Sequence, residues 1–313
     1  MHWIWWIVIA AGAAFLLFGV LPYFVMAGFL YTVLLVRTKP EKWGRECSMP
    51  DDEEIVRMFD EGLAWAERWQ AHKTEVRIRN DGFGLCGEYF DFGHDKAVLI
   101  VAGRMESLLY SYYFAEPYRA AGCNVLVIDN RAHGLSDGKI NSLGFKEYRD
   151  LLAWGRLLHE KGNRKIVIHG ICIGSSAGLF ALTAAGCPDY FAGLVAEGMY
   201  ANFYESFRNH MIEQHHPNFP FTPLVMMYIR LISGADVVHD GPLKRIGRLD
   251  KPLLMLHSRE DIYSTPDRAQ AVFDACGAEE KRLEWFDRGA HSHIRINNTA
   301  RYDQCIIDFL SRI

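Results

Sequence analysis

The sequence predicts an α/β fold in which helices cover both faces of a mostly parallel sheet, with one apolar segment ahead of it. Continuous apolar runs rich in β-branched residues, such as AVLIVA at residues 97–102, are typical of parallel strands buried on both faces. Runs of ten or more residues with helical patterning separate these strands. A chain of 313 residues is long enough for one large domain of this kind.

The elements follow in order along the chain. An antiparallel pair is predicted at TEVRIRN and GLCGEYFDF, which flank the turn DGFG. Further strands are predicted at residues 97–102, 124–129, 165–169, 193–198, 252–258 and 282–286. Helices are predicted at residues 58–72, 110–121, 143–161, 266–276 and 299–312. The expected organisation is an anchor at residues 1–36, a juxtamembrane linker and helix at 37–73, and the catalytic domain at 74–313.

Two segments allow more than one interpretation. Residues 199–240, rich in Phe, Met and His, interrupt the alternation as a helical insertion, and they form either an ordinary excursion with its own small core or a lid over a substrate pocket. The aromatic run YSYYF at residues 110–114 either lines a pocket or packs the first helix, and core packing is favoured.

The N-terminal segment, residues 1–36, contains no Asp, Glu, Lys or Arg and exceeds the roughly 20 apolar residues that cross a bilayer. It lacks the basic start of a cleavable signal peptide, so we expect an uncleaved transmembrane helix rather than a signal peptide or two re-entrant segments broken at Pro22. Basic residues follow the segment, and none precedes it; they are Arg37, Lys39, Lys42 and Arg45. The positive-inside rule therefore predicts a single-pass membrane protein with its catalytic domain in the cytoplasm.

Composition excludes several classes of partner. A net charge of −4, with no basic stripe, argues against nucleic-acid binding. The seven cysteines are scattered without a Cys-x-x-Cys pair, which favours a reducing compartment. Histidines 210, 215, 216 and 239 are too irregularly spaced for a metal site, so we expect no metal and no cofactor.

The stretch KIVIHGICIGSSAG carries a Gly-x-nucleophile-x-Gly turn between a predicted strand and a predicted helix. A tight turn of this kind projects Cys172 into a cleft, and it needs small residues two positions before and after, here Gly170 and Gly174. The N-terminus of the following helix favours a thiolate. The motif by itself is weak evidence for a nucleophile, since a buried structural cysteine in a tight turn gives the same pattern.

An acid and a base follow in the order that such a site requires. Asp261 lies in the loop after the strand at residues 252–258, where a carboxylate can orient a histidine. Glu260 and Asp267 compete for that role. His291 lies in the Gly-containing loop after the last strand and is favoured over His293 as the base, because it is nearer the strand end.

Backbone donors for an oxyanion are expected in two places. The first is the loop after the strand at residues 97–102, where the N–H of Arg104 is expected to face the turn that carries Cys172. The N–H of Met105 is an additional candidate. The second is the N–H of Ile173, directly after the nucleophile.

From residue 74 onward the chain resembles an α/β-hydrolase, of the membrane-anchored branch that is similar to serine aminopeptidases (S33) and monoacylglycerol lipases. The stretches that carry the resemblance are VLIVAGRMES, NVLVIDNRAHGLSDG, IVIHGICIGSSAG, HSREDIYSTP and RGAHSH. The resemblance implies structural roles for Asp129, Arg131, His133 and Gly134. This sequence departs from the pattern at Ala102, where the family has His, and at Cys172, where it has Ser; dienelactone hydrolases, polyhydroxyalkanoate synthases and bile-acid N-acyltransferases have cysteine there.

A cysteine nucleophile suggests the chemistry. A thiol ionises far more easily than a serine hydroxyl, and acylation would produce a thioester that water or another acceptor attacks. We expect hydrolysis of an ester, lactone or thioester of a small-molecule acyl substrate. The aromatic and methionine content of residues 199–230, together with the anchor, suggests a lipid-like substrate. Two alternatives remain: acyl transfer to an amine or alcohol, and a pseudoenzyme that binds an acyl or lipid ligand without turnover.

Overall fold

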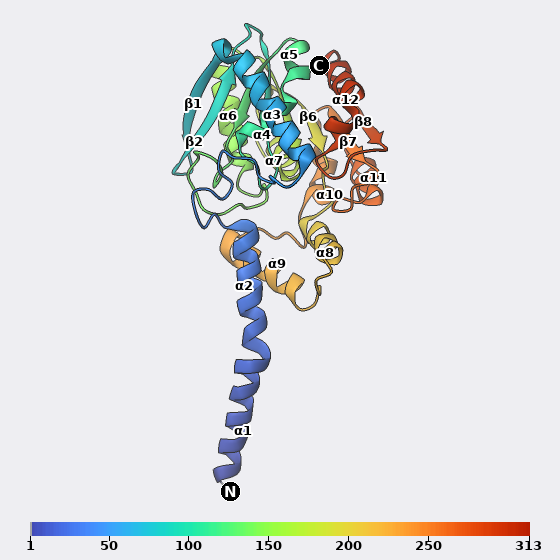
Figure 1. Ribbon diagram of the computed structural model, residues 1–313. Coiled ribbons are helices and arrows are strands. Elements are labelled where there is room, and N and C mark those ends of the chain that lie inside the picture. Colours follow the sequence, from blue (N-terminus) through green and yellow to red (C-terminus); the bar gives the residue numbers. More distant parts are fainter. Residues whose placement is uncertain (1) are drawn as a thin grey trace.

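The central sheet spans the upper part of the molecule in Figure 1 and positions every loop of the site. The computed structural model describes residues 2–313, and in this range the sheet has eight strands in the order β1-β2-β4-β3-β5-β6-β7-β8. They are β1 (Lys73–Asn80), β2 (Phe83–Phe90), β3 (Lys96–Val101), β4 (Cys123–Ile128), β5 (Lys165–Ile171), β6 (Phe191–Glu197), β7 (Leu253–Ser258) and β8 (Lys281–Phe286). β2 pairs antiparallel with β1 and β4, and the remaining neighbours are parallel.

Helices pack on both faces of the sheet, as the sequence predicts. One face carries α6 (Tyr148–Glu160), α7 (Ile173–Leu182) and α11 (Pro266–Asp274), whose apolar side chains share a core cluster with the strands. The other face carries α3 (Glu53–Arg68), α4 (Leu108–Ser111), α5 (Glu116–Ala120) and α12 (Ile294–Leu310). The aromatic run at residues 110–114 lies inside this second core, which confirms its packing role. Parallel strands covered in this way bury every backbone hydrogen-bonding group between helical layers.

The predicted starts of three helices each differ from the structure by five residues: α3 and α12 begin earlier than predicted, and α6 begins at Tyr148 rather than near residue 143. Leu143 and Gly144 adopt left-handed backbone angles, with φ of 59° and 92°, which no helix accommodates. The buried Glu147 carboxylate accepts hydrogen bonds from the N–H groups of Ser142 (2.8 Å) and Gly144 (2.9 Å), so the turn is stabilised by a side chain.

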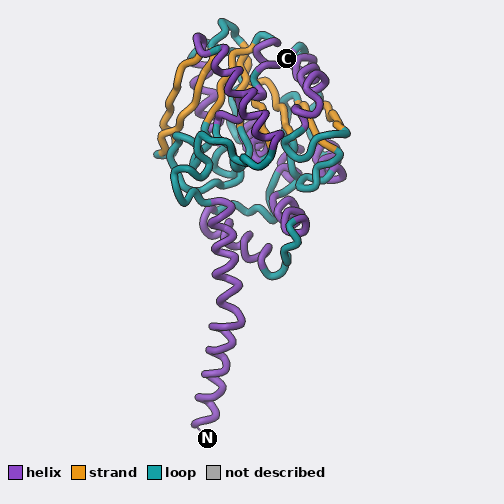
Figure 2. Tube along the Cα trace, in the orientation of Figure 1, coloured by secondary structure: helices purple, strands orange, loops and turns teal. Residues whose placement is uncertain are grey.

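The insertion between β6 and β7 contains α8 (Phe203–Glu213), α9 (Phe221–Ser233) and the short α10 (Pro242–Arg245). Residues 199–240, which we call the cap, lie below the sheet beside the N-terminal helix, as Figures 1 and 2 show. Their buried side chains form a third core cluster together with Ile173, directly after Cys172, and with the N-terminal helix. The insertion therefore shares a core with the N-terminal helix and covers Ile173, next to Cys172.

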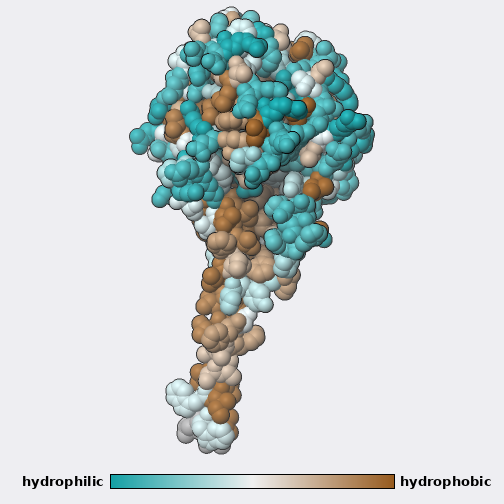
Figure 3. Space-filling model, viewed as in Figure 1, coloured by the Kyte–Doolittle hydropathy of each residue, from teal (hydrophilic) through white to brown (hydrophobic). Residues whose placement is uncertain are grey.

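The apolar N-terminal segment is one helix from Trp3 to Leu35, built of α1 (His2–Ala14), a π-helical turn (Phe15–Val20) and α2 (Leu21–Leu35). Pro22 has no N–H to donate, and the wider turn just before it accommodates this loss without breaking the helix. By length and composition the helix is a candidate membrane span. In Figure 3 it is a column of apolar surface that continues onto the foot of the domain.

The C-terminal end of that helix is buried rather than free. Ala27, Tyr31 and Leu35 are packed into the third core cluster, beside α9. Residues 37–73 likewise pack on the domain, because α3 buries Ile55, Met58 and other side chains against it. The apolar helix and the linker therefore both pack against the domain, although the sequence separates the three segments by composition.

Candidate active site

Cys172 lies in a strained turn between β5 and α7. Its backbone angles are φ 55° and ψ −113°, a region that residues with a side chain rarely occupy. A Cβ on Gly170 would lie 2.3 Å from the backbone of Gly174, and one on Gly174 would lie 2.2 Å from the carbonyl of Val101. Only glycine fits at either position, which is why the elbow motif has two. The turn leaves the thiol half-buried at the carboxyl end of the sheet.

Asp261 and His291 meet beside this turn, although thirty residues separate them. His291 Nδ1 lies 2.7 Å from Asp261 Oδ2, while the other carboxylate oxygen accepts the N–H groups of Tyr263 (2.9 Å) and Ser264 (2.8 Å). Gly198, at the end of β6, makes the room: a Cβ there would lie 3.1 Å from Cε1 of His291. Because Nδ1 is bound to the carboxylate, the second ring nitrogen is free to face Cys172.

The electrostatics of the pair favour an imidazolium. Burial alone would lower the pKa of His291, but the hydrogen-bonded Asp261 carboxylate and the nearby Cys172 sulfur hold that pKa well above its usual value. Burial opposes the ionisation of Asp261 as well, yet the nearby imidazole keeps its pKa below the ordinary range. An imidazolium next to a sulfur is the arrangement that stabilises a thiolate.

The residues that compete in the sequence lie elsewhere. His293 Nε2 is 3.2 Å from Asp52, the residue that caps the N-terminus of α3, so His293 joins two structural elements. Glu260 accepts the N–H of Gly289 (3.0 Å) and stabilises the loop that carries His291. Asp267 is exposed in the first turn of α11.

The loop after β3, residues 102–106, approaches Cys172 closely. A Cβ on Gly103 would lie 3.7 Å from Cβ of Cys172, so this glycine is in contact with the elbow. Arg104 follows it, and its carbonyl accepts a hydrogen bond from His133 Nε2 (2.8 Å). Ile173 directly follows Cys172 and begins α7. Both segments with predicted backbone donors therefore border Cys172, but the N–H of Met105 donates to Glu106 Oε2 (3.2 Å).

The loop after β4 braces these segments. The Asp129 carboxylate accepts the N–H groups of Leu108 (2.9 Å) and Leu135 (2.9 Å), and Arg131 binds Asp150 through two contacts of 2.6 Å. His133 is fully buried, and its two ring nitrogens lie 3.0 Å from the carbonyl of Arg131 and 2.8 Å from that of Arg104. A histidine bonded in this way supports the loop after β3 and is not available as a base.

Comparison with known proteins agrees with this architecture. A family model described as alpha/beta hydrolase fold matches residues 96–223. The esterase Pf2001 of Pyrococcus furiosus is similar with a TM-score of 0.65 and 21% identity, covering 79% of this chain and 93% of that one. The chain has the α/β-hydrolase fold. The α/β hydrolase GrgF from Penicillium sp. sh18 is also similar, with a TM-score of 0.59, 17% identity, and coverage of 77% and 98%.

A curated relative extends the similarity beyond the hydrolase core. The uncharacterized protein YqkD of Bacillus subtilis (strain 168) is 28% identical over 270 residues, which are 84% of this chain and 88% of that protein. The similarity therefore includes most of the chain rather than the elbow region alone.

Three features of this α/β-hydrolase site have no signal in the sequence. The guanidinium of Arg104 donates to the carbonyl of Leu34 (3.0 Å), so the loop after β3 is tied to the end of the N-terminal helix. Glu106 places a carboxylate oxygen 2.6 Å from the position of a Cβ on Gly103, and burial raises its pKa although Arg104 acts in the opposite direction. Glu197 is buried behind the elbow, and burial raises its pKa to about 7. All three depend on tertiary contacts.

Proposed function

We propose that the protein is a hydrolase of carboxylic esters, lactones or thioesters, anchored to a membrane by its N-terminal helix and acting through a Cys172–His291–Asp261 triad. The observation that carries the proposal is the 2.7 Å contact between His291 and Asp261 beside a half-buried cysteine in a strained elbow. The esterases among proteins of similar fold support the same reaction class. The resemblance of the motifs to the S33 and monoacylglycerol-lipase branch, with a cysteine in place of serine, supports the same proposal.

Each residue has a role in the proposed reaction. The Cys172 thiolate attacks the acyl carbon, and the N–H groups of Ile173 and Arg104 stabilise the oxyanion that forms. The His291 imidazolium protonates the leaving alcohol or thiol as the bond to it breaks, which produces a thioester on Cys172. His291 then removes a proton from water, which attacks the thioester and releases the acid and the free thiolate. Asp261 holds the imidazole in the required tautomer throughout.

The membrane part of the proposal rests on the candidate span and on charge. The helix has no Asp, Glu, Lys or Arg, and basic residues lie only on its C-terminal side. This asymmetry supports a cytoplasmic catalytic domain, in which the free cysteines stay reduced.

The test uses the full chain in detergent or lipid nanodiscs, because the end of the helix belongs to the core. The protein is incubated with p-nitrophenyl acyl esters and acyl thioesters, with and without amine or alcohol acceptors, while intact mass and products are followed. We expect an acyl adduct and released acid, and a loss of turnover of about a thousandfold or more in Cys172→Ala.

Cys187→Ala is the matched control, since Cys187 is also a half-buried free thiol but lies outside the site, and this variant should keep full activity. Acyl transfer to the added acceptor in preference to water would identify the protein as an acyltransferase. No adduct and no turnover at any chain length would contradict both enzymatic functions and favour a binding protein.

A further inference from the structure

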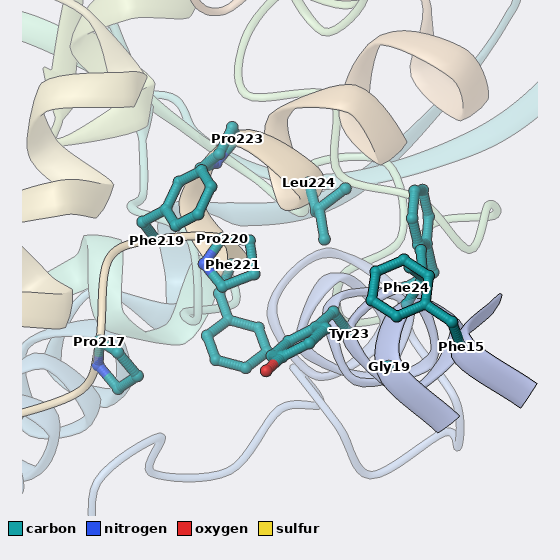
Figure 4. Close-up of a pocket in the computed structure, with 11 residues that line it drawn as sticks. Phe15, Gly19, Tyr23, Phe24, Pro217, Phe219, Pro220, Phe221, Pro223 and Leu224 are labelled. Atoms are coloured by element: carbon teal, nitrogen blue, oxygen red, sulfur yellow. The ribbon is translucent and has the colours of Figure 1, made fainter. Parts of the chain in front are cut away.

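An apolar groove of about 870 Å³ separates the N-terminal helix from the cap. Its wall on the helix side includes Gly19, Tyr23 and Phe24, and its wall on the cap side includes Phe221 and Leu224. Figure 4 shows these side chains facing one another across the groove, with the Tyr23 and Phe221 rings in contact at 5.9 Å between centroids. None of the lining residues, all within the described part of the chain, carries a charge.

The shape of the groove comes from local features of the helix. The π-helical turn at Phe15–Val20 widens the helix where it lines the groove, and Gly19 has no side chain to fill the space beside the Phe15 ring. Further along, Gly28 allows close contact with Tyr228 of α9, whose hydroxyl donates to the carbonyl of Phe24 (3.1 Å). The cap therefore contacts the helix on the C-terminal side of the groove, toward Gly28, and is separated from it at the groove itself.

The groove lies at the depth of lipid acyl chains if the helix spans a bilayer. The helix from Trp3 to Leu35 has 33 residues, or about 50 Å, whereas the hydrocarbon core is about 30 Å thick. A span of about 20 residues that starts at the exposed Trp3 ends near Pro22. Phe15, Gly19 and Val20 of the groove then lie in the leaflet next to the domain, and Tyr23 and Phe24 lie at its boundary with water. Phe219, with 82% of its surface exposed at the groove, extends the apolar surface of the cap toward the same leaflet.

The groove and the thiol border the same apolar core. Phe221, Leu224 and Cys172 are half-buried at the edge of a single core cluster, the third, which the helix and the cap build together. Along the helix, Tyr23 in the groove and Leu34, which accepts the Arg104 guanidinium, are separated by about 16 Å. Half of the hydrocarbon core is about 15 Å, so this separation is close to the length of an acyl chain in one leaflet.

We propose that this groove binds one acyl chain of a bilayer lipid, so that its ester carbonyl is presented to Cys172 from the membrane side. The assignment rests on the hydrolase function proposed above and names its substrate class as a membrane lipid ester. A soluble ester would need no groove on the part of the helix that faces lipid, whereas a lipid reaches it without crossing water.

The experiment uses the full chain in phosphatidylcholine nanodiscs that contain a phospholipid with a diazirine at the end of one acyl chain. After illumination, peptide mass mapping should recover the label on the groove residues of the helix and of α9. Leu224→Trp fills the groove and should reduce this labelling about tenfold. Leu231→Trp is the matched control, since Leu231 lies on the same helix with 72% of its surface exposed and does not line the groove.

A second measurement compares p-nitrophenyl esters of long and short chains. In Leu224→Trp the ratio of kcat/KM for the long chain to that for the short chain should fall about tenfold, and in Leu231→Trp it should not change. Label spread evenly along the helix and unaffected by Leu224→Trp would overturn the groove assignment, even where Cys172-dependent hydrolysis of short esters supports the proposed function. Groove labelling without any Cys172-dependent hydrolysis would support the groove and contradict the hydrolase. If Leu224→Trp fails to fold, the position of the label on the wild-type chain tests the groove assignment: label concentrated on the groove residues supports it, and label spread evenly along the helix contradicts it.

Discussion

At the scale of single residues, the candidate site depends on which carboxylate each histidine contacts: His291 contacts Asp261, and His293 contacts Asp52. Asp261 accepts two backbone N–H groups with one oxygen and His291 with the other, so its position is fixed before the imidazole binds. His293, two residues later, faces the opposite way because Ser292 between them has a φ of 66°. The local backbone thus separates a proposed base from a histidine that joins α12 to α3.

This separation predicts different results for two similar substitutions. His291→Ala should slow the alkylation of Cys172 by iodoacetamide at pH 7 at least about tenfold, because the imidazolium that stabilises the thiolate is lost. His293→Ala should leave that rate within about twofold and instead lower thermal stability, since the contact with Asp52 is lost. Mass spectrometry of the modified peptide measures both rates. The opposite pattern would make His293 the base.

At the scale of elements, the end of β6 supports the elbow from behind. The carbonyl of Glu197 accepts the N–H of Cys172 and the hydroxyl of Ser175, both at 2.9 Å, so strand and elbow are joined at the nucleophile. The side chain of the same residue is fully buried and is hydrogen-bonded by Tyr302 of α12. An ionisable group in this position couples the stability of the domain to pH.

Glu197 should make the folded protein less stable as pH rises. Its pKa is about 7 in the folded protein against an ordinary value of 4.5, so the folded state binds more protons than the unfolded state between these pH values. The free energy of unfolding should therefore fall across this window, by about 3 kcal/mol at most. Glu197→Gln, which cannot ionise, should remove this loss. Denaturant unfolding of both proteins at pH 5 and pH 8 measures the difference, and an equal change in both would contradict the assignment.

At the scale of the whole molecule, the N-terminal helix is part of the folded domain. Its last turns share a core with the cap, and Lys42 binds the carbonyls of Thr32, Val33 and Val36 at its C-terminal end. The backbone of Arg37 donates to Lys139 (2.7 Å), and Asn141 donates to Leu35 (3.0 Å), so the chain is joined to the loop before α6. A fragment that begins after the helix would leave this core open.

Two substitutions on the same helix test this role. Tyr31→Ala removes a side chain that is 97% buried and stacked on Tyr228, and it should lower the free energy of unfolding by about 3 kcal/mol. Phe29→Ala removes an aromatic ring with 60% of its surface exposed and should change that energy by less than about 0.5 kcal/mol. Thermal unfolding in detergent compares the two. Equal small effects would show that the helix end contributes little to the fold.

The parts that could be predicted from the sequence are those that local patterns determine. The strands around the elbow, the Gly-x-Cys-x-Gly turn and the loops after β7 and β8 all carry their signal within a few residues. The burial of Tyr31 and Leu35 could not be predicted, because an apolar helical face looks the same whether lipid or protein covers it. The Arg104 contact with Leu34 and the buried Glu197 join segments far apart in the chain, and no local pattern records such pairs.

The basic residues after the helix have a consequence for any study of its topology. Arg37 donates to the carbonyl of Gly134 (2.9 Å), Lys42 caps the helix, and Arg45 forms ion pairs with Glu88 and Asp129. Replacing them to invert the orientation would also remove interactions that the folded domain uses. Lys39, which is exposed, and new charges ahead of Trp3 are the positions where insertion can be altered without disturbing the fold. At the other three positions, the charges that would bias insertion into a membrane are the charges that hold the folded domain together.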